Sequence, residues 1–362
     1  MIKEMVIMAS SLLFASNILA GIEKTVSTTE INTLKTQLPM AEWGTINKLT
    51  ISGPLCDKDI IFISNVAKAT NQLTELDMSG VTELPQIGKQ AFSGLKSLSM
   101  VSLPASVNTI AERAFMDCVN LTSVTMPSNG LTTIEDRAFC NCTSLNTITL
   151  PAPLGQLSHS AFNGCSNLQE YKVAAGSEYL SSIYGVLYTM EDQTLLAYPI
   201  ARGDEEFVIP DGTTKIGEGA FKDVKTLKSI EFPASVTSIS KNAFNGCENL
   251  SLLIIGDGVT QIGDYAFMDC SGLTSISMPR TLKSLGDGVF IRCCNITSIR
   301  CESVTPPSVR PNTSPFFSQD ESICSLKTDV CELSIPKGSS AKYKASDLWN
   351  VFVNIDEFQV GK

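Results

Sequence analysis

The chain has 362 residues, with 27 Lys or Arg against 37 Asp or Glu, a formal net charge of −10 and an isoelectric point near 4.8. This acidic balance argues against a surface that binds nucleic-acid phosphates. The single histidine, His159, leaves little material for a Ser/His/Asp or Cys/His catalytic site or for a zinc centre.

The first twenty residues have the pattern of a secretory signal peptide. A lysine precedes an apolar run over residues 5–19, and the small Ala20 follows it. Because the run is shorter than about 18 residues and contains serines, we predict cleavage before Gly21 rather than anchoring in a membrane. No later apolar stretch approaches the length of a span, and the first cysteine is Cys56. The chain is therefore expected to be exported, without a lipid-modified N-terminal cysteine or a further membrane span.

Residues 21–72 do not follow the repeat that begins at Leu73. Residues 48–52 (KLTIS) read as a strand, and Asp57–Thr70 reads as a helix with Asp57 as its N-cap. End units of repeat proteins are usually atypical because they cover an open apolar end. Residues 21–72 are therefore predicted to be an N-terminal cap.

Between residues 73 and 301 the pattern LxxLxLPxxVxxIxxxAFxxCxx recurs. Its phenylalanine follows Ala or Val at Phe92, Phe115, Phe139, Phe162, Phe221, Phe244, Phe267 and Phe290, in steps of 23 or 24 residues apart from one of 59. This period with a leading LxxLxL is typical of a leucine-rich-repeat solenoid. The leading apolar alternation predicts a strand that the proline ends, so stacked coils form a parallel sheet. The phenylalanines are predicted to form one interior column.

The 59-residue step contains an insertion at about residues 174–206. Segments 185–189 (GVLYT) and 195–199 (LLAYP) are separated by turn residues and predict a β-hairpin standing on the solenoid. Four of the seven tyrosines lie here, namely Tyr179, Tyr184, Tyr188 and Tyr198. We favour packing of the hairpin as their role. An exposed recognition patch is the alternative.

Residues 302–362 are predicted to be a C-terminal cap. After a proline-rich stretch, residues 331–336 predict an edge strand, residues 337–349 a short helix, and residues 351–355 a last strand that closes the end.

Six cysteines share the position three residues after the repeat phenylalanine: Cys118, Cys142, Cys165, Cys247, Cys270 and Cys293. Leu95 and Val224 occupy this position in two other coils, so we predict buried thiols rather than ligands or disulfides. Among the remaining cysteines, Cys324 with Cys331 is the one disulfide that we expect. The chain has no CxxC pair, GxSxG, P-loop or GxGxxG motif. No catalytic residue, metal site or cofactor site is therefore predicted.

The repeat unit, with its strand variant Ile209-Pro210-Asp211-Gly212, closely resembles the BspA-like leucine-rich-repeat family of bacterial surface and secreted proteins. The segments YGVLYTMEDQTLLAYP and PKGSSAKYKASDLWNVFVNI extend the resemblance, which covers roughly residues 45–358. It implies a solenoid fold, a location outside the bacterial cell or on its surface, and adhesion to host or bacterial proteins. It supplies no catalytic residues.

A repeated surface without a convergent polar cluster favours a binding protein over an enzyme. Two strand positions in each coil are predicted to face solvent, and many of them hold Ser or Thr, which suit a solvated sheet equally well without a partner. Leu252 and Ile254 are apolar exceptions. The candidate protein-binding residues are Leu252, Ile254, Arg300, Lys172 and Glu231. The alternatives are glycan binding through the hairpin tyrosines and a structural envelope protein.

Overall fold

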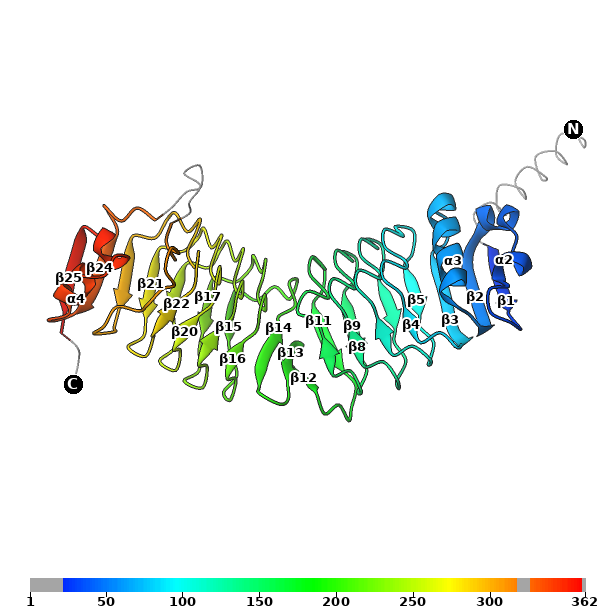
Figure 1. Ribbon diagram of the computed structural model, residues 1–362, viewed down its shortest axis with the longest axis horizontal. Helices are drawn as coiled ribbons and strands as arrows, with labels where there is room; N and C mark the ends of the chain where they lie inside the picture. Colours follow the sequence, from blue (N-terminus) through cyan, green and yellow to red (C-terminus); the bar gives the residue numbers. More distant parts are fainter. Residues whose placement is uncertain (1–21, 318–325, 360–362) are drawn as a thin grey trace, which may run out of the picture. The chain divides into compact units, whose positions relative to one another are not determined.

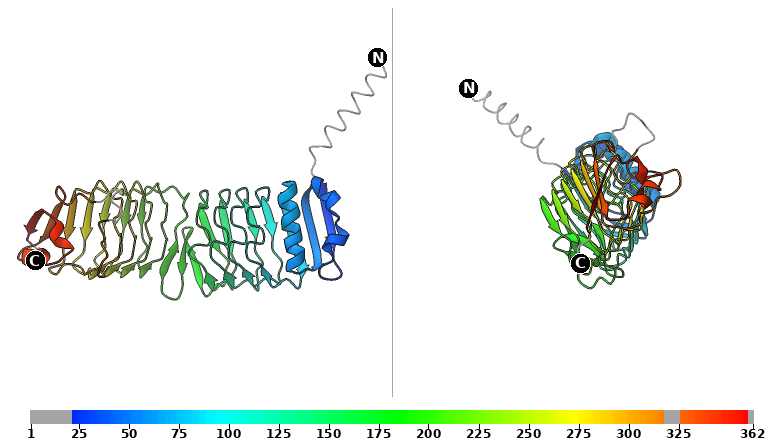
Figure 2. Two further views of the ribbon diagram at one scale, coloured as in Figure 1. Left: turned by 45° about the horizontal axis from the view of Figure 1, so that its top comes forward. Right: turned by 90° about the vertical axis from the view of Figure 1, so that its left-hand side faces the viewer.

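The computed structural model describes residues 22–317 and 326–359, which form two compact units divided between Ser166 and Asn167. We call them the N-terminal and C-terminal units. Each is a parallel β-solenoid, as the repeat predicts, and successive coils place their strands side by side (Figure 1 and Figure 2). The strands that lead the coils form what we call the first sheet, and the short strands after the proline corner form the second sheet.

The N-terminal unit contains ten strands among its described residues: β1 (Ile22–Ser27), β2 (Ile46–Pro54), β3 (Glu75–Thr82), β4 (Gln86–Ile87), β5 (Met100–Ser102), β6 (Thr109–Ile110), β7 (Ser123–Thr125), β8 (Thr133–Ile134), β9 (Thr147–Leu150) and β10 (Gln156–Leu157). Its first sheet has the order β1-β2-β3-β5-β7, with β9 beside β7, and its second sheet has the order β10-β8-β6-β4. The paired strands within each of these two orders are parallel.

The N-terminal unit also contains three helices near its start: α2 (Leu34–Gln37), the 3₁₀ helix η1 (Met40–Thr45) and α3 (Asp57–Thr70). The limits of α3 match the predicted helix, but the predicted N-cap is wrong because Cys56 holds that position. The carboxylate of Asp59 reaches back and accepts the Cys56 amide at 3.1 Å and the Asn32 amide at 2.7 Å. One buried carboxylate thus fixes the helix start to the preceding loop.

The described part of the C-terminal unit contains the strands β11 (Glu170–Val173), β12 (Leu180–Ile183), β13 (Val186–Thr189), β14 (Thr194–Ala197), β15 (Glu206–Val208), β16 (Lys215–Ile216), β17 (Ser229–Glu231), β18 (Ser238–Ile239), β19 (Leu252–Ile254), β20 (Gln261–Ile262), β21 (Ser275–Met278), β22 (Ser284–Leu285), β23 (Ser298–Cys301), β24 (Glu332–Pro336) and β25 (Asn354–Phe358). Its first sheet comprises β15-β17 and β19-β21-β23-β24-β25, with β17 beside β19. Its second sheet has the order β12-β13-β14-β16-β18-β20-β22.

The insertion forms the predicted hairpin from β13 and β14, which pair antiparallel. It does not stand on the solenoid as expected. β14 pairs in parallel with β16, Leu195 opposite Ile216, and β12 adds a third antiparallel strand. Leu195 is fully buried. The insertion is therefore the first part of the second sheet, because its apolar face continues the column of the coils that follow.

The described residues after β23 include α4 (Ser340–Lys344) and the 3₁₀ helix η2 (Trp349–Val351). β24 lies between β23 and β25, so the prediction that it forms the sheet edge is wrong. The last strand is β25, which begins three residues later than predicted. Residues 349–351 belong instead to η2, which buries Trp349 and lets its indole donate to the Pro307 carbonyl at 3.1 Å.

The interior column of phenylalanines is confirmed in both units. Phe92, Phe115, Phe139 and Phe162 stack in the N-terminal unit with ring centroids 5.2 to 5.3 Å apart. In the C-terminal unit Tyr198, Phe221, Phe244, Phe267, Phe290 and Phe316 stack at 4.7 to 6.0 Å. The sequence pattern missed the two ends of this second stack, because Tyr198 is a tyrosine in place of the repeat phenylalanine and Phe316 follows Pro315 instead of Ala or Val.

The six repeat cysteines are buried free thiols, as predicted. Each thiol donates to the carbonyl of the repeat phenylalanine in the preceding coil, at 3.0 to 3.2 Å. Cysteine therefore supplies both a small apolar group and a donor. Cys331 is also a free, buried thiol, so the predicted disulfide with Cys324 is wrong, and Cys324 itself lies outside the described residues. Cys294 is disulfide-bonded.

Left-handed residues flank the Ala-Phe segment. Two residues after the phenylalanine, φ is positive at Gly94, Asp117, Asn141, Gly164, Asp223, Gly246, Asp269 and Arg292. Two residues before it, φ is positive at Gln90, Arg113, Arg137, Gly219, Asn242, Tyr265 and Gly288. These turns direct the phenylalanine inward, and the frequent Gly, Asn and Asp at the first set are the sequence signal for them.

Candidate functional site

The outward face of the first sheet in the C-terminal unit consists of two columns of side chains. In β15, β17 and β19 the middle residue is buried and the two flanking residues face solvent. The first column is Glu206, Ser229, Leu252, Ser275 and Ser298, and the second is Val208, Glu231, Ile254, Ser277 and Arg300. The inward and outward strand positions are thus those expected from the repeat.

Three apolar side chains are exposed on this otherwise polar face. Val208 is 62% exposed, Leu252 45% and Ile254 56%. We call them the apolar trio. Sequence reasoning identified Leu252 and Ile254 but missed Val208, although the alternation Glu206-Phe207-Val208 could have shown it. Neighbouring strands lie about 4.8 Å apart, so Val208 and Ile254, two strands apart in one column, are separated by about 10 Å.

Glu231 lies between Val208 and Ile254 in the second column. Its carboxylate makes no ion pair or hydrogen bond with any residue of 22–317 or 326–359. The same holds for Glu206 in the first column. The lysine beside them, Lys228, is paired with Glu205 at 2.8 Å. The trio is therefore accompanied by carboxylates that lack a cation within the described part of the chain.

The other predicted binding residues already have partners. The guanidinium of Arg300 lies 3.5 Å from the centroid of the Phe358 ring, and its Nε donates to Glu302 at 3.1 Å. Lys172 is paired with Glu170 at 3.3 Å on β11, which packs against β12 and β13. Only Leu252, Ile254 and Glu231 among the five predicted residues lie together with free side chains.

The four insertion tyrosines do not form one patch. Tyr179 and Tyr184 are exposed, whereas Tyr188 and Tyr198 are buried. Burial raises the pKa of Tyr188. Tyr198 stacks on Phe221, and its hydroxyl donates to Asp204 at 2.7 Å. Packing, the role we favoured, describes Tyr188 and Tyr198, and the alternative of an exposed patch is left with Tyr179 and Tyr184.

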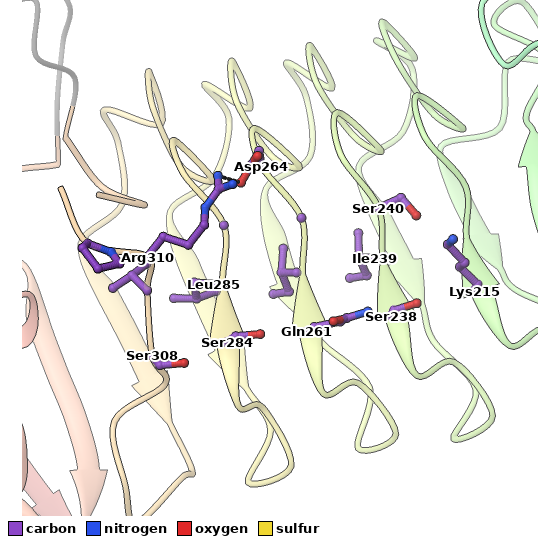
Figure 3. A pocket seen from close by; sticks show the side chains of 15 residues that line it. Lys215, Ser238, Ile239, Ser240, Gln261, Asp264, Ser284, Leu285, Ser308 and Arg310 are labelled. Atoms are coloured by element: carbon purple, nitrogen blue, oxygen red, sulfur yellow. Dashed lines mark hydrogen bonds and ion pairs between the residues drawn. The ribbon is translucent and has the colours of Figure 1, made fainter. Parts of the chain in front are cut away.

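The second sheet of the C-terminal unit carries a shallow groove of about 560 Å³. Ser238, Gln261, Ser284 and Ser308 follow one another across it, and Lys215 lies at one end (Figure 3). At the other end Arg310 pairs with Asp264 at 2.6 Å. At Gly286 an added Cβ would lie 2.4 Å from the Asp264 amide, so glycine permits the close stacking here. The groove is lined by both polar and apolar side chains and holds no pair of groups arranged for acid–base catalysis.

Residues 22–317 and 326–359 contain neither a cluster of metal ligands nor a helix that could cross a membrane. Within these ranges no group of three or more His, Cys, Asp or Glu is placed to hold a metal ion. Within the same ranges no helix has both the length and the apolar character needed to cross a membrane.

A family model described as a BspA type leucine rich repeat region matches residues 63–184 and 204–311, with six copies. A search of curated proteins found no match.

Three solved structures of bacterial proteins are similar to this chain. A leucine-rich cell surface protein of Faecalibacterium prausnitzii is 28% identical, with a TM-score of 0.54, over 71% of this chain and 73% of its own. The pneumococcal vaccine antigen PcpA is 20% identical with a TM-score of 0.59, over 87% and 80%. A leucine-rich repeat protein of Eubacterium ventriosum is 19% identical with a TM-score of 0.54, over 86% and 90%. The last two share the fold.

Proposed function

Because this chain belongs to the BspA-type leucine-rich repeat family, we propose that it is an exported, non-enzymatic protein that binds a protein partner through the first sheet of its C-terminal unit. The signal-like pattern of residues 1–20 supports export. The similar protein of F. prausnitzii is described as a cell surface protein, which supports the same location.

The observation that carries the proposal is the exposed apolar trio. Exposed apolar side chains that cluster on a polar surface mark interaction sites more often than isolated ones do. Burying the exposed parts of Val208, Leu252 and Ile254 would contribute about 2–4 kcal/mol in total. That is enough for the central anchor of an interface, with polar neighbours giving specificity. Arg300 and Lys172 remain proposed contacts at its border.

The test is a double substitution, Leu252→Asp with Ile254→Asp. Partners are first captured from host extracellular matrix and from surfaces of neighbouring bacteria, then purified, and their affinity is measured by surface plasmon resonance. The double variant should bind at least about 2 kcal/mol more weakly, because apolar burial is lost and carboxylates must be desolvated. Its unfolding transition should stay unchanged, since both side chains face solvent.

Met100→Asp is the matched control, because Met100 is an exposed apolar residue of the first sheet in the N-terminal unit. It should leave the affinity as it is. Equal affinity of the double variant and the unmodified protein would contradict the proposed surface. If no purified partner binds at all, the structural envelope role gains support instead.

A further inference from the structure

Glu231 occupies an unusual place for a carboxylate on the first sheet. It lies in register with Val208 on β15, and β19 with Ile254 lies on its other side. Both of these neighbours are apolar and more than half exposed. The exposed column is therefore apolar, acidic and apolar in turn: it offers dispersion contacts at both ends and a negative charge in the middle.

No cation of the described chain neutralises this column. Lys228 is held by Glu205, and Arg300 is held by Glu302 and the Phe358 ring. Glu206 adds a second unpaired carboxylate on β15, in the first column. For Glu205 and Glu302, which flank this sheet, the protein supplies its own counterions. At the apolar trio it leaves two carboxylates without them.

We propose that the partner presents a basic segment in which an arginine or lysine lies along Val208 and Ile254 and places its charge on Glu231. This inference rests on the proposed function, because it names the chemistry of the partner that the same surface takes. The aliphatic stem of such a side chain covers apolar surface while its charged head stays at the carboxylate. Arginine fits better than lysine, because its planar fork can donate two hydrogen bonds to one carboxylate.

The negative charge of this surface also argues against an acidic partner. An acidic segment on the trio would bring like charges against Glu231 and Glu206, which interfaces avoid. A second copy of this chain would do the same, since it would place the same two carboxylates opposite themselves. The net charge of −10 adds long-range attraction for a basic partner and faster association at low salt.

The test uses a phage-displayed library of random short peptides selected on the purified protein. Selected peptides are synthesised, and their affinities are measured by isothermal titration calorimetry at low and high salt. We expect peptides that combine Arg or Lys with a large apolar residue. Their affinity should fall about tenfold or more for Glu231→Gln and for the Leu252→Asp, Ile254→Asp double variant. Glu332→Gln is the control, because Glu332 is exposed on β24 of the same sheet, away from the trio.

The outcomes separate this inference from the proposed function. Two results would contradict a basic partner while leaving the proposed binding surface supported. In the first, the peptides bind the double variant more weakly but bind Glu231→Gln unchanged. In the second, the selected peptides carry no excess of Arg or Lys. Peptides that bind the double variant as well as the unmodified protein would overturn both. Sedimentation velocity tests for self-association. If the unmodified protein self-associates and the double variant does not, the inference is contradicted, because a second copy of the chain would then occupy the surface. If Glu332→Gln weakens peptide binding as much as Glu231→Gln does, the effect is general charge attraction, and a specific contact with Glu231 is contradicted.

Discussion

At the scale of single residues, the phenylalanine column is the main source of stability that can be tested directly. Phe244 is fully buried, with Phe221 and Phe267 at 4.7 and 5.0 Å. We predict that Phe244→Ala lowers the free energy of unfolding by about 3–5 kcal/mol, because it removes apolar burial and leaves a cavity between two rings. Urea unfolding measures the change, with Leu252→Ala on the exposed face as control. A loss below about 1 kcal/mol would contradict the column.

The thiol column has a chemical signature at alkaline pH. Burial raises the pKa of Cys118 and of Cys165 to about 12 and raises that of Cys270 as well. The thiolate is the reactive form. Iodoacetamide at pH 8 should therefore modify the partly exposed Cys56 and Cys140 in the folded protein, while the column reacts only in denaturant. Mass spectrometry of peptides measures both, and fast labelling of Cys270 without denaturant would refute the prediction.

The same pKa shifts predict how stability changes with pH. In the unfolded chain these thiols lose their protons near pH 9, the ordinary pKa, whereas in the folded protein they keep them to higher pH. The folded state then binds more protons, so the free energy of unfolding falls as pH rises above about 9. Below this pH the contribution of the column is fully present.

At the scale of elements, the left-handed corner before Phe92 offers a stabilising substitution. Gln90 has φ of 56° with an exposed side chain, and glycine holds the same place at Gly219 and Gly288. We predict that Gln90→Gly raises the free energy of unfolding by about 0.5–1 kcal/mol, since relief of backbone strain exceeds the entropy cost of glycine. Gln90→Ala keeps the Cβ and should give no gain. If both variants unfold at the same urea concentration, strain at this corner is too small to matter.

At the scale of the whole molecule, coils should behave as interchangeable units. Removing residues 234–256 of the C-terminal unit deletes one 23-residue period and joins Pro233 to Asp257, which keeps the repeat pattern. Because each coil contacts mainly its neighbours, we predict that this variant keeps its circular dichroism spectrum and a cooperative thermal transition. Removing residues 234–245, about half a period, misaligns the columns and should abolish the transition. Loss of folding in both variants would show coupling beyond neighbouring coils.

The solenoid was predictable because the same positions of every repeat carry the side chains that face inward. Phe92 to Phe290 and the six cysteines were placed correctly for that reason. Positions outside the pattern were not: the N-cap at Cys56, the interior place of β24, and the junction of β14 with β16 depend on contacts between segments that share no periodic signal. Only part of the candidate surface could be predicted from the sequence. Leu252 and Ile254 follow from the columns, whereas the Arg300 contact with Phe358 depends on the cap.

Over residues 73–308, the side-chain donors that reach a main-chain carbonyl of a neighbouring coil point one way along the chain. The repeat thiols donate to the coil before them, and so do hydroxyls such as those of Thr122 and Thr274, which reach the carbonyls of Ser99 and Ser251. Synthesis runs in the same direction, from the N-terminus onward. Each newly made coil therefore covers these carbonyls of the coil made just before it. During synthesis, only the most recently made coil leaves these carbonyls open to proteases and to neighbouring nascent chains. This holds whatever the number of coils already completed.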